Sequence, residues 1–132
     1  MIIPSFLNEA LLNRVSLSSI DLENTIKSLG LDVLNYGVID KETDKVELIV
    51  QDDRESLLNM IRKYLMKKPI HEEVHVFWSN LNKYSILCDI KFVLENLDNI
   101  FDEDWDFWII GGNKKWVIEN YHEEELSIFL LN

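Results

Sequence analysis

Residues 71–75 read His-Glu-Glu-Val-His and match the H-E-x-x-H pattern of zinc metalloproteases. In those enzymes two histidines one helical turn apart bind the same zinc ion, and the glutamate acts as the base. This chemistry requires a helix, which the spacing of Ile70, Val74 and Phe77 leaves open. The β-branched and aromatic run over 74–79 favours a strand instead, on which His71 and His75 would lie roughly 13 Å apart. We expect the strand, which leaves a zinc hydrolase as a remote alternative.

Three other patterns could do chemistry, and each lacks a required part. The acidic run 102–106 could attract Ca²⁺, but it has neither the glycine nor the spacing of a calcium loop. His122 beside Glu123–Glu125 could form an acid–base pair, but the sequence places no nucleophile or oxyanion donor near it. Gly111-Gly112 is too short for a phosphate-binding loop. From the sequence we therefore expect that the protein is not an enzyme and that it has no catalytic residue, metal site or cofactor.

The negative charge of the chain is concentrated in its last third. The net charge is −11 over 132 residues. Residues 95–132 contain ten carboxylates and two lysines, so this stretch holds −8 of the −11, while the first 94 residues have 14 acidic and 11 basic side chains. The ten carboxylates are Glu95, Asp98, Asp102, Glu103, Asp104, Asp106, Glu119, Glu123, Glu124 and Glu125.

Aromatic residues alternate with these acids, which is the composition of a surface that binds a basic protein. Trp and Tyr anchor many interfaces, and the charges around them set the rate and specificity of encounter. We expect one or two of Trp105, Trp108 and Tyr121 to be exposed as anchors. The carboxylates expected to supply the electric field are Asp102, Glu103, Asp104, Asp106, Glu123 and Glu124.

Composition excludes several other classes of partner and compartment. An excess of acid argues against nucleic acid, which needs Lys and Arg for phosphate contacts, and against anionic membranes. Cys88 has no second cysteine to pair with, and the first residues do not resemble a signal peptide. We therefore expect a cytoplasmic protein folded as one domain over residues 1–132.

The first half of the chain predicts helices around a pair of strands. Ser5 can cap a helix that runs to Val15, and a Ser18–Asp21 capping box can open a second helix that ends at Gly30. Within 33–50, Leu34, Tyr36 and Val38 alternate before a turn, and Val46, Leu48 and Val50 alternate after it. Asp52 and Glu55 open the most regular helix, which Pro69 stops after Lys68.

The second half predicts five strands around one more helix. Strands are expected over 74–79 and 84–88, followed by a helix capped by Asp89. Three further strands over 105–110, 115–120 and 126–131 are joined by turns, the first of them Gly111-Gly112-Asn113. The order ααββαββαβββ predicts an α+β domain with a mainly antiparallel sheet. Because Asp106 and Glu119 lie on these strands, one face of the sheet is expected to be wet.

The C-terminal stretch resembles the strand-rich, Trp-containing and acidic ends of bacterial immunity proteins. The resemblance covers about a quarter of the chain, together with its size and acidity. Its residues are Trp105-x-x-Trp108, Lys115-Trp116-Val117-Ile118 and Tyr121-His122-Glu123-Glu124-Glu125-Leu126. These families belong to polymorphic toxin systems, including contact-dependent growth inhibition. The resemblance implies one-to-one inhibition of a cognate toxin, commonly a basic nuclease.

Two questions stay open from the sequence. The same acidic surface could serve an adaptor or regulatory module of a mobile element or phage, which would bind a different basic partner. In addition, the segments 102–106 and 121–125 could form one surface, or they could form two patches at opposite ends of the sheet.

Overall fold

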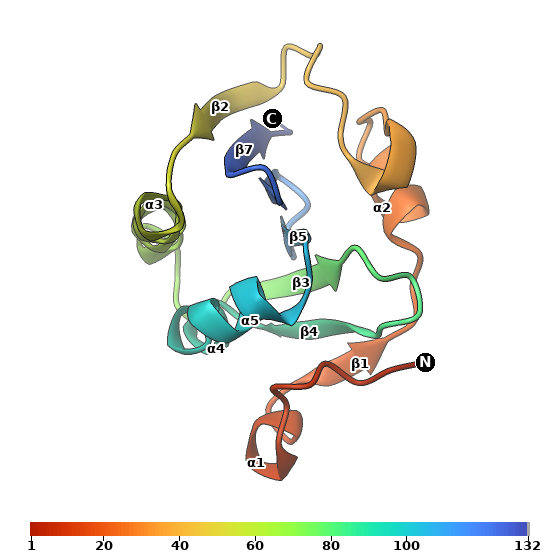
Figure 1. The fold of residues 1–132 in the computed structure, drawn as a ribbon, viewed down its shortest axis with the longest axis vertical. Helices are drawn as coiled ribbons and strands as arrows, with labels where there is room; N and C mark the ends of the chain where they lie inside the picture. The colour runs from red at the N-terminus through yellow and green to blue at the C-terminus, as the bar shows by residue number, and fades with distance from the viewer. Residues whose placement is uncertain (132) are drawn as a thin grey trace.

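The apolar strands at the C-terminal end form the middle of a single antiparallel sheet. A computed structural model describes residues 1–131, apart from the side chain of Tyr36, and places seven strands there in the order β1-β4-β3-β5-β6-β7-β2 (Figure 1). The strands are β1 (Ser16–Ser18), β2 (Val46–Gln51), β3 (Glu73–Trp78), β4 (Ser85–Asp89), β5 (Phe107–Gly111), β6 (Trp116–Tyr121) and β7 (Glu125–Leu130). The predicted α+β class with an antiparallel sheet is confirmed.

Three of the helices begin at an aspartate that caps their first turn. Asp21, Asp53 and Asp89 accept a hydrogen bond from the backbone N–H three residues further on. The cap of the third helix is thus Asp53 rather than Asp52. The helices are α1 (Glu9–Leu12), α2 (Leu22–Ser28), α3 (Arg54–Met66), α4 (Ile90–Glu95) and α5 (Leu97–Glu103). No helix within residues 1–131 has the length and apolar character needed to cross a bilayer.

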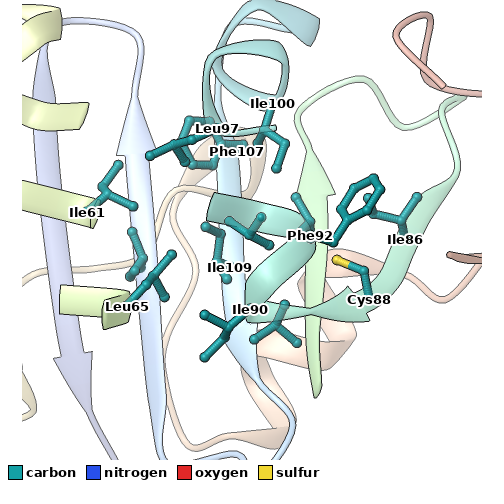
Figure 2. Close-up of a cluster of buried hydrophobic side chains, with 14 of the residues drawn as sticks. Ile61, Leu65, Ile86, Cys88, Ile90, Phe92, Leu97, Ile100, Phe107 and Ile109 are labelled. Carbon is teal, nitrogen blue, oxygen red and sulfur yellow. The ribbon is translucent and has the colours of Figure 1, made fainter. Parts of the chain in front are cut away.

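One face of the sheet packs against α3, α4 and α5. Ile61 and Leu65 of α3, together with Phe92 of α4 and Ile100 of α5, meet Ile109 of β5 in a fully buried apolar cluster (Figure 2). Alternation along the strands gives this face Phe107 and Ile109 from β5, and Trp116 and Ile118 from β6. This cluster is the larger of the two apolar cores.

The opposite face is also covered, so the expectation of a wet face is wrong. Helix α2 and the segment 31–46 lie on this side of the sheet (Figure 1). They pack over Trp108, Val117 and Phe129, which are all completely buried. Asp106 and Glu119 are buried as well, and hydrogen bonds inside the protein offset the cost of burying their carboxylates. The acidic residues in the predicted strands were therefore not evidence that this face of the sheet is exposed to solvent.

The structure corrects three local predictions and adds one strand that was not predicted. The segment expected as a strand over 34–38 contains a 3₁₀ turn, η1 (Asn35–Gly37), in which Gly37 has φ +83°. The first helix is shorter than predicted, because it begins after the cap Asn8 and not at Ser5, and it ends at Leu12. The three-residue strand β1 was not predicted. The helix after Asp89 breaks at Asn96, whose side-chain amide donates to the carbonyl of Phe92.

The strand interpretation of the His-Glu-Glu-Val-His segment is confirmed, and the helical alternative is wrong. His75 lies within β3, and His71 precedes it in a turn. Nδ1 of His71 is 3.1 Å from Asp89, whereas Nε2 of His75 is 2.7 Å from the hydroxyl of Ser85. Because the two imidazoles turn to different partners, this segment does not form the helical zinc site that the pattern requires.

Candidate functional site

The two acidic segments of the C-terminal third meet at one end of the sheet. Strands β5 and β6 are antiparallel with Phe107 opposite Asn120, so the start of β5 lies beside the end of β6. The backbone N–H of His122 donates to Oδ1 of Asp106 at 2.6 Å, and Nδ1 of its ring is 3.0 Å from the same oxygen. The single-surface alternative is therefore correct, and the two-patch alternative is wrong.

Three aromatic rings stand in a row at this end of the sheet, and we call them the aromatic ridge. Trp105 is 72% exposed, and its ring meets the edge of His122 at 5.0 Å between centroids. His122 in turn lies 4.4 Å from Tyr121. Burial and the neighbouring carboxylates of Glu123 and Asp106 raise the pKa of the Tyr121 phenol above its ordinary value, so the ridge presents a neutral phenol beside an exposed indole.

The sequence drew attention to Trp105 and Tyr121 but not to His122 as a member of the same cluster. The predicted hairpin could have placed His122 in this cluster, because antiparallel pairing brings the residues before β5 beside the residues after β6. Asp106 then fixes the imidazole of His122, and this ring separates Trp105 from Tyr121.

Two hollows flank the aromatic ridge, and all three ridge residues line both of them. The larger one, of about 560 Å³, is completed by Leu34, Asn35, Val38, Ser79 and Asp106. The smaller one, of about 260 Å³, is completed by Arg54, Leu57, Phe101, Asp102, Asp104, Asn120 and Glu124. The larger hollow is lined mainly by loop residues, whereas the lining of the smaller one includes the carboxylates of Asp102, Asp104 and Glu124.

The carboxylates that precede β5 are bound to other parts of the protein. Asp102 pairs with Arg54, and Asp104 accepts the backbone N–H of Asn80 at 2.8 Å. The side chain of Glu103 is only 2% exposed and pairs with Lys83 at 2.5 Å. Although burial opposes ionisation, hydrogen bonds from Lys83 and from Ser5 hold the pKa of Glu103 below its ordinary value. These acids fasten the loop before β5 in place.

The carboxylates that follow β6, unlike those before β5, are not bound to other parts of the protein. Glu123 and Glu124 are exposed, and their side chains form no hydrogen bond or ion pair with any other residue in 1–131. They lie in the three-residue turn between β6 and β7, where Glu124 adopts φ +59°. This left-handed conformation favours Gly or Asn over Glu. The turn therefore presents two unpartnered charges at some conformational cost.

Trp108 does not belong to this surface, which corrects its expected role as an anchor. It is fully buried on β5, and its indole N–H donates to Oε2 of Glu119 at 2.8 Å. Glu119 also accepts the backbone N–H of Ile39 at 2.8 Å and pairs with Lys41. Glu103 and Asp106 are likewise too buried to contact a partner directly. The accessible predicted residues are Asp102, Asp104, Trp105, Tyr121, Glu123 and Glu124.

Chemically, this arrangement can attract and hold a positive group. Carboxylates supply the long-range field, and the faces of Trp and Tyr attract cations at short range. Among residues 1–131 no three His, Cys, Asp or Glu side chains come together as metal ligands would. No protein-family model matches the chain, and a search of curated proteins finds no match. The interpretation of the site therefore rests on its own residues.

Proposed function

We propose that this protein is an immunity protein that binds a basic toxin through the aromatic ridge and the adjacent Glu123 and Glu124, and thereby neutralises it. The single observation that carries the proposal is the exposed indole of Trp105, held against His122 and lying near the carboxylates of Glu123 and Glu124, which have no partner among residues 1–131. The resemblance of the C-terminal stretch to immunity proteins points to the same activity.

The exposure of Trp105 supports a binding role because a tryptophan contributes a large apolar area when it is buried. Trp side chains bury about 150–250 Å² and dominate the energetics of many interfaces. The ring is held by its edge contact with His122, and the adjacent backbone N–H donates to Asp104. Such a preorganised anchor loses little conformational entropy when a partner covers it.

The charge of the chain supports a cationic partner. The net charge of −11 attracts basic proteins over long distances, and Glu123 and Glu124 concentrate that attraction beside the ridge. Electrostatic steering raises association rates to roughly 10⁸ M⁻¹s⁻¹ or more at low salt. Fast capture suits an inhibitor that must act before its toxin does damage.

A nuclease is the class of toxin that this surface fits best. Nucleases hold phosphates with Lys and Arg, and carboxylates on an inhibitor can occupy the same positions. Glu123 and Glu124 have no intramolecular ion pair to break among residues 1–131 before they make such contacts. They are therefore better placed to do so than Asp102, which already pairs with Arg54.

Co-expression with the adjacent gene product tests this proposal. An immunity gene directly follows its toxin gene, so we expect the product of the gene immediately upstream to arrest growth when expressed alone. Co-expression of the wild-type protein should restore growth, and Trp105→Ala should fail to restore it. Leu81→Ala serves as the matched control, because Leu81 is also an exposed apolar side chain, at 76% exposure, outside both hollows of the ridge.

The outcomes separate the proposal from its alternatives. Growth restored by wild type and by Leu81→Ala, but not by Trp105→Ala, supports an immunity protein that acts through the ridge. A stable complex with an upstream product that does not arrest growth would instead indicate an adaptor. Restored growth with Trp105→Ala would show that the toxin is bound elsewhere.

A further inference from the structure

Asn120 carries a buried amide oxygen that has no hydrogen-bond partner among the described residues 1–131. The residue is 2% exposed. Buried side-chain amides are nearly always paired, because an unpaired one loses its hydrogen bonds to water without replacement. Asn120 also lines the smaller hollow, so a donor group that enters the hollow is the candidate to complete this oxygen.

The position of Asn120 on β6 directs it into the smaller hollow. Alternation along β6 places Asn120 on the same face as Ile118, which is the face covered by α3 and α5. These helices supply Arg54, Leu57 and Phe101 to the wall of the hollow, and Asn120 contributes to it from the sheet. Asn120 and the three residues of the ridge therefore line the same hollow.

The remaining walls of this hollow suit one flat cation. Asp102, Asp104 and Glu124 line it against the single guanidinium of Arg54, which leaves a net charge of −2. Its volume of about 260 Å³ is below the roughly 300–1,000 Å³ of pockets for drug-sized ligands. The space therefore suits one side chain and not a nucleotide or a larger cofactor.

We propose that the smaller hollow is a socket for one arginine side chain of the bound partner, with Asn120 as its buried acceptor. A guanidinium fits better than an ammonium because it stacks on aromatic rings and donates in a planar fork to carboxylate and amide oxygens. The protein already shows this mode of packing in the same wall, where Arg54 lies 4.6 Å from the ring centroid of Phe101. The socket specifies which side chain of the basic partner is bound, and this inference therefore rests on the proposed function.

Nα-acetyl-arginine amide provides a direct probe of the socket. We expect it to bind with a dissociation constant on the order of 1 mM, as the size of the ligand allows. In ¹H–¹⁵N spectra the side-chain amide of Asn120 and the indole N–H of Trp105 should shift together. Nα-acetyl-citrulline amide has the same shape without the charge, and it should bind at least about tenfold more weakly.

Two variants distinguish a socket from a merely structural asparagine. Asn120→Leu removes an unpartnered polar group and preserves volume, so the unfolding midpoint should stay equal or rise, while binding of the arginine probe weakens about tenfold. Glu124→Gln removes a charge on the rim, where folding is not at stake, and should weaken the probe about threefold. Glu47→Gln removes an exposed charge from β2 outside the hollow and should leave binding unchanged.

Each outcome bears on a different claim. Shifts that are the same for the arginine and citrulline probes, or that survive both Asn120→Leu and Glu124→Gln, would overturn the socket. If the arginine probe fails to bind while the upstream toxin is still neutralised through Trp105, the socket is wrong and the proposed function stands. If the probe binds as described but growth is not restored, the socket stands and the proposed function is wrong.

Discussion

Asp102–Asp106 precedes β5, Glu123 and Glu124 follow β6, and both segments lie at the same end of the sheet. In the first segment Asp102, Glu103, Asp104 and Asp106 each bind a cation, a ring nitrogen or a backbone N–H elsewhere in the fold. In the second segment the two glutamates bind no other residue in 1–131 through their side chains. Carboxylates therefore have two different roles at this end of the sheet: the first group stabilises the surface, and the second is available to a partner.

The largest difference between the two segments should appear in folding stability. Glu103→Gln leaves Lys83, whose side chain is 10% exposed, without its buried anion. We expect a loss of about 3 kcal/mol in the free energy of unfolding. Glu123→Gln, its counterpart in the second segment, should change stability by less than about 0.5 kcal/mol. Urea unfolding of both variants checks this, and equal losses would remove the distinction between the segments.

The next largest effect should appear in binding. Trp105→Ala should weaken association with the cognate partner by about 2 kcal/mol or more, because an exposed aromatic anchor becomes buried in the complex. The same change should leave stability within about 0.5 kcal/mol of wild type. Calorimetric titration measures the first quantity and urea unfolding the second. A variant that binds normally would show that the ridge is not the anchor.

Acid should narrow the stability difference between wild type and Glu103→Gln. Against opposing burial, hydrogen bonds from Lys83 and Ser5 hold the folded pKa of Glu103 below 4.5, its ordinary value. The stability that this carboxylate supplies is present above pH 4.5 and is lost as the pH falls through the lower folded pKa. Unfolding midpoints below pH 4.5 should therefore fall less steeply for Glu103→Gln than for wild type or Glu123→Gln. Parallel curves would contradict an anchored Glu103.

The smallest effect concerns the strained turn. Glu124 has φ +59° and Lys114, in the turn between β5 and β6, has φ +61°. Replacing either with Gly relieves left-handed strain, which the greater freedom of glycine in the unfolded chain partly offsets, so each variant should gain about 0.5 kcal/mol. Only Glu124→Gly should also weaken partner binding. If both variants bind normally, the charge of Glu124 does not contribute to the interface.

Much of the fold could be predicted from the periodicity of the sequence, whereas the residues that are exposed at the surface could not. The alternation in β5–β7 and the aspartate cap of α4 are local signals, and the structure agrees with them. The predicted Ser18–Asp21 capping box is wrong in detail, because Asp21 and not Ser18 caps α2. The exposure of individual tryptophans is not local. Trp105 and Trp108 are three residues apart, and Trp108 is buried because α2 and the irregular segment 31–46 cover it. The alternation of apolar residues over 34–38 predicted a strand there, and the structure has a 3₁₀ turn instead, so the position of this segment over the sheet was not predicted.

The roles of the individual carboxylates could not be predicted from the sequence either, because they depend on contacts between distant residues. Lys83 reaches Glu103 across twenty residues, and Lys41 reaches Glu119 across seventy-eight. Such pairings depend on tertiary structure alone. The convergence of 102–106 with 121–125, in contrast, follows from antiparallel pairing once the Gly111-Gly112-Asn113 turn is accepted. That part of the site was predictable.

The salt dependence of association with the upstream toxin tests the central claim most directly. Glu123→Lys/Glu124→Lys and Glu47→Lys/Glu73→Lys both raise the net charge from −11 to −7, and Glu47 and Glu73 lie toward the opposite end of the sheet. We expect the first pair to lower the association rate constant about tenfold at low salt and to flatten its salt dependence, and the control pair to change it less than about twofold. Equal effects of the two pairs, or no effect of the first, would contradict a binding surface at Glu123 and Glu124.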